Sequence, residues 1–158
     1  MTPKIKTNWH LYTPDLEISF PNMKSWVEED NSLMNRLRLL ETKIDLIVLD
    51  EQICKHHDAQ TTAEPVLGNL RKIFLKSDHN LVFAESFFSQ DVIKEFAKFG
   101  RLEEEPLGKY LFSDSNIKKH ETYIADYELD DQTFLGRKCI YSYNDQKFSV
   151  IEVFLFNE

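Results

Sequence analysis

The sequence predicts an α+β domain built on a single antiparallel β-sheet of about six strands. Six runs of apolar residues have the length and spacing of β-strands, and the helical patterns between them are few and short. Neighbouring runs are joined by tight polar turns, which connect antiparallel rather than parallel strands. The expected strands are residues 43–49, 70–76, 81–88, 122–129, 135–143 and 147–156.

Before the first expected strand, residues 22–40 have the pattern of one broken helix or two short helices. Ser32 can cap the second helix, because its hydroxyl can accept a hydrogen bond from a backbone N–H of the first turn. Leu33, Leu37 and Leu40 then fall on one face at helical spacing. These features predict a short amphipathic helix.

The middle of the chain predicts a loop, a hairpin and a helix. Residues 56–66 are polar and form the expected loop, while residues 77–80 have the composition of a tight turn between two strands. Ser89 can cap a helix over residues 90–99, which should stop at Gly100. The side chains expected to point inward from this helix are Val92, Ile93, Phe96 and Phe99.

Length and composition limit the class of protein. The chain has 158 residues, 42% of them hydrophobic, which is enough for one domain with a sizeable core. It shows no repeat, low-complexity stretch or linker, so residues 1–158 are expected to form one domain. The formal net charge of −8 argues against a nucleic-acid surface, because phosphate recognition depends on clustered Lys and Arg.

Several other classes of site are not expected. Residues 1–16 contain no continuous apolar segment, which predicts neither a signal peptide nor a membrane span. Cys54 and Cys139 give no disulfide framework, so the expected compartment is the reducing cytoplasm. His56 and His57 lie near Cys54, but adjacent histidines in a strand point to opposite faces, and no metal site is expected. No glycine-rich phosphate loop is present, and no cofactor is expected.

The last expected strand carries one charge in an apolar run. Residues 148–156 read Phe-Ser-Val-Ile-Glu-Val-Phe-Leu-Phe, which is typical of a strand buried on both faces, with Glu152 as its one ionisable group. A buried carboxylate must meet a cation, take up a proton, or hydrogen-bond to a ligand that binds reversibly. Glu152 is therefore either a structural ion-pair partner or a group that faces a ligand.

Arg71 lies in the expected strand 70–76, where a period of two places it on the same face as Ile73 and Leu75. A guanidinium on an apolar face offers a rigid fork of donors suited to a carboxylate. That carboxylate could belong to Glu152 or to a bound acid. The strand by itself favours the structural ion pair.

The most specific motif is Pro106-Leu107-Gly108-Lys109-Tyr110-Leu111-Phe112. Proline suits a first helical turn, and the apolar residues fall on one side, so the motif predicts a short packed helix. Followed downstream by an apolar strand with a single Glu, it resembles the chorismate pyruvate-lyase family, which has Pro-Leu-Gly-Arg-Tyr-Leu-Phe and Thr-Glu-Leu-Phe-Leu in these places. The resemblance covers residues 22–156 and includes residues 26–37, residues 70–75 and the Gly136-Arg137 pair.

The resemblance implies helices and flaps that cover an internal ligand site, and it implies roles for four residues. Arg71 would bind the ring carboxylate of the substrate, assisted by the backbone N–H of Leu107. Glu152 would face the oxygen at the far end of the ring, and Leu33 would sit on a mobile cover. Arg71 and Glu152 would be the catalytic residues.

Two positions depart from the family pattern. Met34 stands where the family usually has Thr, and Ser86 stands where it often has an arginine. Chorismate carries two carboxylates, so the loss of one cation near the site weakens the expectation of that substrate. A related, less charged cyclic acid is left open.

The resemblance implies a cofactor-free lyase that converts chorismate to 4-hydroxybenzoate and pyruvate. Glu152 would donate to or stabilise the departing ether oxygen, and burial would favour the protonated form that donation needs. The alternative is a non-catalytic protein of the same fold that binds an aromatic acid. Because one chain can enclose such a site, we expect a monomer whose partner is a small anionic cyclic acid, with neither nucleic acid nor membrane as a partner.

Overall fold

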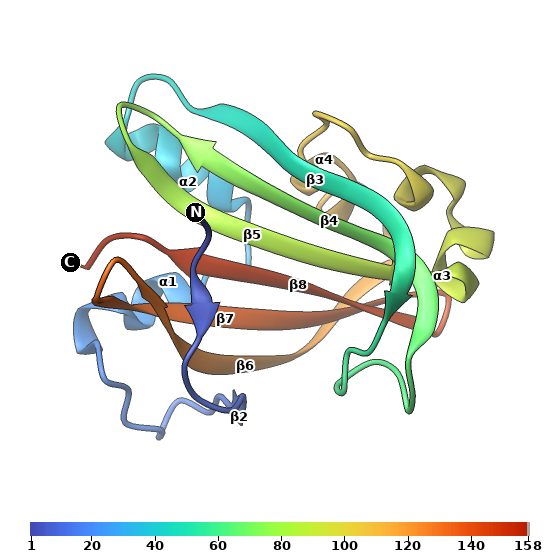
Figure 1. Ribbon diagram of the computed structural model, residues 1–158, viewed down its shortest axis with the longest axis horizontal. Coiled ribbons are helices and arrows are strands. Elements are labelled where there is room, and N and C mark those ends of the chain that lie inside the picture. The colour runs from blue at the N-terminus through green and yellow to red at the C-terminus, as the bar shows by residue number, and fades with distance from the viewer. Residues whose placement is uncertain (158) are drawn as a thin grey trace.

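The computed structural model describes residues 1–157, which form one eight-stranded antiparallel sheet (Figure 1). The strand order is β1-β6-β7-β8-β5-β4-β3, and β2 also pairs with β6. The strands are β1 (Lys4–Ile5), β2 (His10–Leu11), β3 (Asp45–His56), β4 (Val66–Lys76), β5 (Asn80–Ser89), β6 (Ile117–Leu129), β7 (Gln132–Tyr143) and β8 (Gln146–Phe154). The α-helices are α1 (Lys24–Val27), α2 (Leu33–Leu40), α3 (Gln90–Glu95) and α4 (Gly108–Leu111), with 3-10 turns at Pro21–Met23 and Ala97–Gly100.

The α+β prediction on an antiparallel sheet is confirmed, but the expected number of about six strands is too low. The two additional strands, β1 and β2, are each two residues long and pair along the edge of β6. Segments this short have no periodic pattern, so their pairing with β6 determines them. β3 is also longer than expected, because a register shift between Val48 and Asp50 interrupts the alternation that marks a strand.

Both predicted helix caps are present. The Ser32 hydroxyl accepts a hydrogen bond from the N–H of Asn35 at 3.2 Å, and the Ser89 hydroxyl accepts one from Val92 at 3.4 Å. The expected helix over residues 90–99 is broken, because Phe96 adopts an extended φ of −142° between α3 and the 3-10 turn that ends at Gly100. Leu33 and Leu37 are buried as expected, but Leu40 at the end of α2 is 55% exposed.

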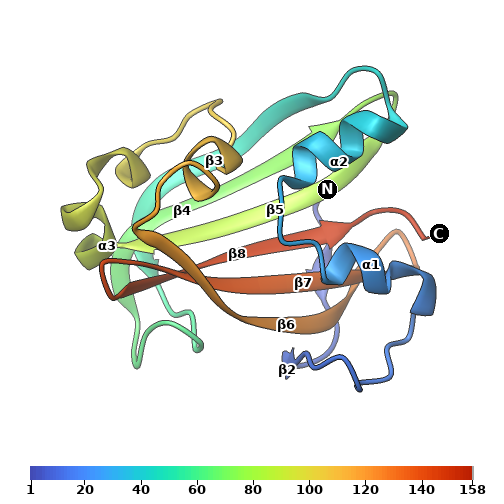
Figure 2. The ribbon, with the colours of Figure 1, turned by 180° about the vertical axis from the view of Figure 1, so that it is seen from behind.

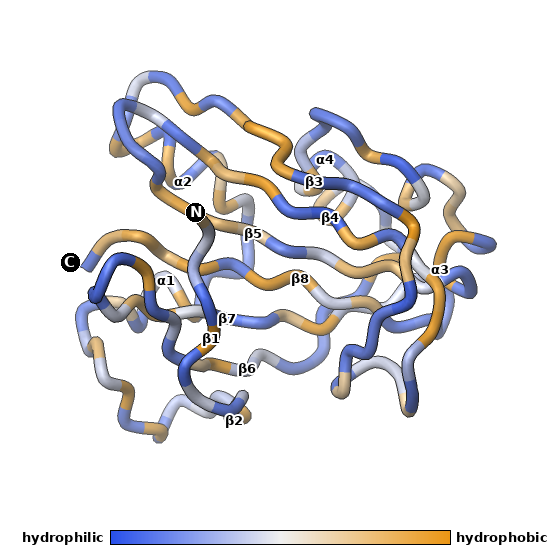
Figure 3. The backbone as a smooth tube through the Cα atoms, viewed as in Figure 1, coloured by the Kyte–Doolittle hydropathy of each residue, from blue (hydrophilic) through white to orange (hydrophobic). Residues whose placement is uncertain are grey.

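One face of the sheet carries the helices. In the reverse view, α1, α2 and α4 lie in front of the strands, with α2 over the end near the β4–β5 hairpin and α4 further along the sheet (Figure 2). Hydrophobic stretches follow β3, β4, β5 and β8 along the tube (Figure 3). Under the helices, core side chains such as Trp26, Leu37 and Phe154 pack together, and a second cluster around Phe88, Phe99 and Phe148 continues this core toward α3.

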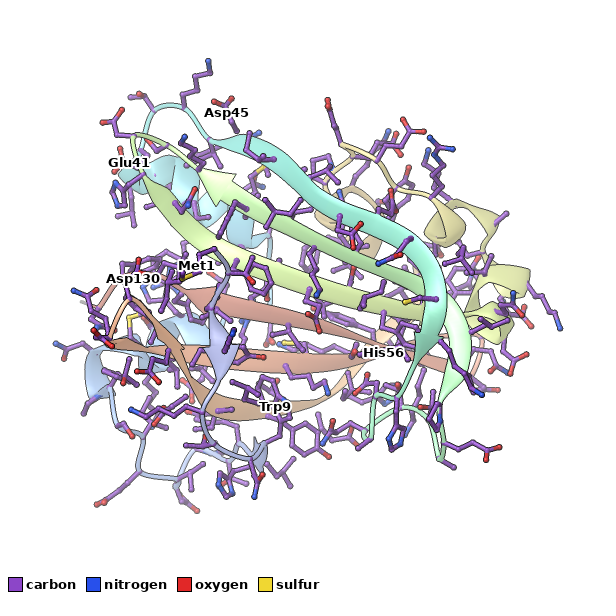
Figure 4. The ribbon with its side chains drawn as sticks, in the orientation of Figure 1. Met1, Trp9, Glu41, Asp45, His56 and Asp130 are labelled. Atoms are coloured by element: carbon purple, nitrogen blue, oxygen red, sulfur yellow. The ribbon has the colours of Figure 1, made fainter. Side chains whose placement is uncertain are left out.

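The opposite face of the sheet has its own packing. Aromatic residues of β4, β5 and β6 gather there with Trp9, whose ring centroid lies 5.9 Å from that of Tyr127 (Figure 4). Lys138 of β7 and Asp58 of the β3–β4 loop form a buried ion pair, with exposed fractions of only 5% and 3%. The Lys138 ammonium also donates to Gln60 at 2.6 Å. The pair therefore fastens the loop to the sheet.

The residues around His56 that resemble a metal-binding cluster have other partners in the structure. His56 ends β3 and packs on the Phe87 ring at 4.8 Å (Figure 4), while Asp58 is engaged by Lys138. Among residues 1–157, no three His, Cys, Asp or Glu side chains are grouped so that they could hold a metal ion. None of the helices in the described residues has the length and apolar character needed to cross a membrane.

Candidate functional site

A cavity of about 350 Å³ lies between the helix-covered face of the sheet and the segments above it, a volume suited to a small cyclic ligand. The strands β3, β4, β5, β8 and β7 form its floor, and α2 and the 106–112 segment form its cover. Arg71, Leu107, Leu33 and Glu152, the four residues singled out from the sequence, all line this cavity.

Strand register fixes how the two charged candidates lie. One row across the sheet runs Arg71, Ser86, Val150, and the next runs Ile73, Ala84, Glu152, Arg137. Rows two residues apart are separated by about 7 Å and neighbouring strands by about 4.8 Å. The Cα atoms of Arg71 and Glu152 are therefore roughly 12 Å apart. Glu152 has Arg137 as its direct neighbour instead.

Arg71 is held by backbone rather than by a carboxylate. Its Nη2 donates to the carbonyl oxygens of Glu103 at 2.8 Å and Glu105 at 2.7 Å, and the residue is 2% exposed. Burial lowers the pKa of Arg71, opposed by the charges of Glu51 and Glu105. Its Nε is buried without a hydrogen-bond partner in the described residues. A buried donor of this kind requires an acceptor, and a ligand carboxylate in the cavity would supply one.

Glu51 supports Arg71 from the neighbouring strand, where the two residues are register partners. The Glu51 carboxylate accepts hydrogen bonds from the N–H groups of Leu102 at 2.7 Å and Glu103 at 2.8 Å. Glu103 adopts a φ of 55°, the left-handed region that strains a residue with a side chain. Glu51 and Arg71 therefore both hydrogen-bond to the backbone of the same strained loop, residues 102–105. This loop leads into the Pro106 motif.

Glu152 forms an ion pair with Arg137. The Arg137 Nε donates to Oε1 of Glu152 at 2.9 Å, and the side chains are 3% and 15% exposed. Burial lowers the pKa of Arg137, but the charge of Glu152 and the other interactions of the guanidinium, its hydrogen bond to Glu152 among them, together outweigh burial, and the net shift is upward. The Nη1 of Arg137 also donates to three backbone carbonyls, those of Trp26, Val27 and Glu29. Arg137 thus ties Glu152 to the segment that leads from α1 to α2.

The structural ion pair between Arg71 and Glu152, which the Arg71 strand alone favoured, is wrong. Of the three options open to a buried carboxylate, Glu152 takes the first and meets a cation, Arg137. Sequence reasoning used Gly136-Arg137 only as part of a resemblance, because the pairing depends on the register between β7 and β8.

The cover is built from two segments that meet. Leu33 begins α2 and is 5% exposed. Leu107 precedes the first residue of α4, where N–H groups have no partner within a helix. A Cβ built on Gly108 would lie 3.7 Å from the Ser32 hydroxyl oxygen. The two covering segments therefore approach each other beside Leu33 and Leu107.

A sequence model of the chorismate lyase family matches residues 5–158, nearly the whole chain. The chain belongs to the chorismate lyase family. It is 26% identical over 152 residues to a probable chorismate pyruvate-lyase of Pseudoalteromonas translucida (strain TAC 125), covering 84% of this chain and 83% of the relative. It is 25% identical over 160 residues to a probable chorismate pyruvate-lyase of Pseudoalteromonas atlantica (strain T6c / ATCC BAA-1087), covering 87% and 82%.

The two departures from the family pattern lie in the wall of the cavity. Met34 lines it from α2, and Ser86 lines it from β5. Ser86 is 6% exposed and is the register partner of Arg71. An arginine at this position would stand beside Arg71, whereas Ser86 leaves this part of the cavity floor uncharged.

Proposed function

We propose that this protein is a cofactor-free lyase that converts chorismate to 4-hydroxybenzoate and pyruvate. One observation supports this most: a buried arginine with an unpartnered Nε and a carboxylate line the same cavity from successive rows of the sheet. Family membership supports the reaction class. The direct test is to add chorismate to the purified protein and to follow both products.

In this proposal, Arg71 binds the ring carboxylate and the N–H of Leu107 adds a second donor. The apolar side chains of Ile73, Val150 and Leu33 enclose the ring and exclude water. Because the Glu103 and Glu105 carbonyls fix the guanidinium in advance, little freedom is lost when the ligand binds. The ring then extends toward the Glu152 row.

The reaction needs little covalent chemistry from the protein. The C–O bond between ring and enolpyruvyl group breaks, and the ether oxygen leaves with that group and the bonding electron pair. The ring loses a proton, whose C–H electron pair forms the double bond that makes the ring aromatic. The enolpyruvate takes up a proton and becomes pyruvate, so no oxidant or reductant is required. Glu152, held in place by Arg137, accepts a hydrogen bond from the distal ring oxygen and orients the ring.

One observation favours the second candidate, a protein that binds an aromatic acid without turning it over. The uncharged Ser86 lies beside Arg71 in the cavity floor, and a site with little positive charge suits a ligand with a single carboxylate. The two candidates differ in one measurable property. The lyase releases pyruvate from chorismate, and the binding protein does not.

Arg71→Ala should weaken binding of 4-hydroxybenzoate by about 2–4 kcal/mol, because a desolvated carboxylate loses its charge partner. Arg71→Lys should recover only part of this, since an ammonium lacks the planar fork. Calorimetric titration measures both. Lys72→Ala is the matched control, because Lys72 is next in the strand, points to the opposite face and pairs with Glu85 at 3.9 Å. Unchanged affinity in Arg71→Ala would remove Arg71 from the binding site.

We also expect the protein to be a monomer in solution, because one chain supplies every wall of the cavity. Sedimentation at micromolar concentration should give a single species near the chain mass of 18.7 kDa. The surface on which a second copy could pair is the edge strand β3. This strand exposes Ile47 and Ile53 and offers unpaired backbone groups. A stable dimer at this concentration would contradict the expectation.

A further inference from the structure

Arg38 is a cation of the cavity cover that makes no polar contact stabilising the fold of the described residues. It lies in the last turn of α2, its side chain is exposed, and it lines the cavity. Within residues 1–157, no hydrogen bond or ion pair joins Arg38 to another side chain or to the backbone. A position near the C-terminus of a helix suits a cation, but it does not explain why the side chain faces the cavity.

The other cations that line the cavity are engaged. Arg137 is neutralised by Glu152 at 2.9 Å, and Lys109 lies 3.2 Å from a carboxylate oxygen of Glu105. Arg71 is fixed by two carbonyls at the floor. Arg38 is therefore the one lining cation in the described residues whose charge and donors are wholly available to a ligand.

Arg38 is also placed at the end of the cavity away from Arg71. Along β4 the lining residues run from Arg71 through Ile73 to Leu75, and Leu75 pairs with Leu46 of β3. α2 extends toward the β4–β5 hairpin, and α4 lies further along the sheet (Figure 2). Arg71 binds the carbonyls of Glu103 and Glu105 in the loop that leads to α4. A ring held by one carboxylate at Arg71 therefore directs its far half toward the Glu152 row and the α2 cover.

We propose that Arg38 binds the second carboxylate of a dicarboxylic cyclic ligand. This inference rests on the lyase activity proposed above, in which the second carboxylate belongs to the enolpyruvyl group. Of the two sheet cations that line the cavity in the described residues, Arg71 is taken by the ring carboxylate in this proposal and Arg137 pairs with Glu152. Arg38 provides one from the cover, with a planar fork of donors suited to a carboxylate.

A cation in this place would make the affinity for the substrate higher than the affinity for the product. Chorismate carries both carboxylates, whereas 4-hydroxybenzoate retains only the ring carboxylate that Arg71 binds. Arg38 therefore strengthens binding of the substrate and contributes nothing to binding of the product. When the enolpyruvyl group leaves, the contact between ligand and cover is lost, which favours release of the aromatic acid.

The test compares the two ligands in one variant. Arg38→Ala should weaken chorismate about tenfold or more and change the affinity for 4-hydroxybenzoate less than about twofold. Arg38→Lys should restore part of the chorismate affinity. Binding is measured by calorimetry, and where chorismate is turned over the same comparison is read as the KM for chorismate and the inhibition constant of 4-hydroxybenzoate. Raised salt should weaken chorismate more in the wild type than in Arg38→Ala.

Lys43→Ala provides a matched control, because it removes an equal charge from an exposed site, 81% accessible, that does not line the cavity. It should leave both affinities unchanged. Equal weakening of both ligands by Arg38→Ala, or no weakening of either, would overturn the proposal. If wild-type protein binds chorismate without releasing pyruvate, the lyase activity fails, and a selective loss in Arg38→Ala would still support the second carboxylate site.

Discussion

Glu152→Gln should lower turnover of chorismate by a factor of about one hundred or more in protein that remains folded. Glutamine keeps the shape of the side chain and can still accept from the Nε of Arg137, which now stands at 2.9 Å. It cannot carry the negative charge that orients the distal ring oxygen, and it cannot hold a proton during the reaction. Specific activity is measured from pyruvate release and normalised to folded protein.

The stability of Glu152→Gln separates the two roles of this carboxylate. Arg137 loses its counter-charge but keeps three backbone carbonyl acceptors, so we expect the free energy of unfolding to fall by only about 1–3 kcal/mol. Glu85→Gln is the matched control, because Glu85 lies on β5 beside Ile151 and faces the opposite side of the sheet. A Glu152→Gln protein that melts much earlier yet retains its specific activity would show that the carboxylate is architectural.

Asp58→Ala should lower the free energy of unfolding by about 3–5 kcal/mol, because it leaves the buried Lys138 ammonium without its counter-charge. Gln60 still accepts from Lys138 at 2.6 Å, but an amide oxygen does not neutralise the charge. The pair lies on the face of the sheet opposite the cavity, so ligand affinity of the folded protein should not change. Urea unfolding, together with calorimetry for the ligand, measures both.

The same pair predicts a loss of stability in acid. Burial raises the pKa of Asp58, but the charge of Lys138 and hydrogen bonds from Lys138, Ser149 and Thr61 lower it more, and the net shift is downward. A carboxyl whose pKa is lowered by folding stabilises the protein above its unfolded pKa, and this contribution is lost as pH falls through the folded value. The stability difference between wild type and Asp58→Ala should therefore be constant above about pH 5 and shrink below about pH 4.

The exposed pair of Lys43 and Asp45, at 3.9 Å, provides the comparison. Asp45→Ala should change stability little, because water screens a pair of this kind. An Asp58→Ala protein as stable as wild type would mean that the attraction between Lys138 and Asp58 only offsets the desolvation of the two groups.

Local patterns in the sequence predicted the parts of the fold that depend on neighbours along the chain. Ser32 and Ser89 cap helices because a hydroxyl needs only an N–H three residues away. A period of two correctly placed Arg71 on the cavity face with Ile73 and Leu75. The strands β1 and β2 could not be predicted, because their two-residue segments depend on pairing with β6.

The site was predictable as a set of residues but not as a set of contacts. Arg71 and Glu152 both line the cavity, yet their separation follows from strand order, which places β5 between β4 and β8. Arg137 and Glu51 were missed as partners because each acts through a register that no local pattern encodes. The sequence did contain a signal for Arg137. This charged residue alternates with the apolar residues Leu135 and Cys139, which places its side chain on an apolar face of the strand.

The measurement that tests the proposed function most directly is the simultaneous release of both products from chorismate by purified protein. We predict that pyruvate and 4-hydroxybenzoate appear in equal amounts without added cofactor, and that Glu152→Gln and Arg71→Ala slow both while Glu85→Gln and Lys72→Ala do not. Chorismate that binds in calorimetry but yields neither pyruvate nor 4-hydroxybenzoate would contradict the lyase and establish a binding protein with this fold.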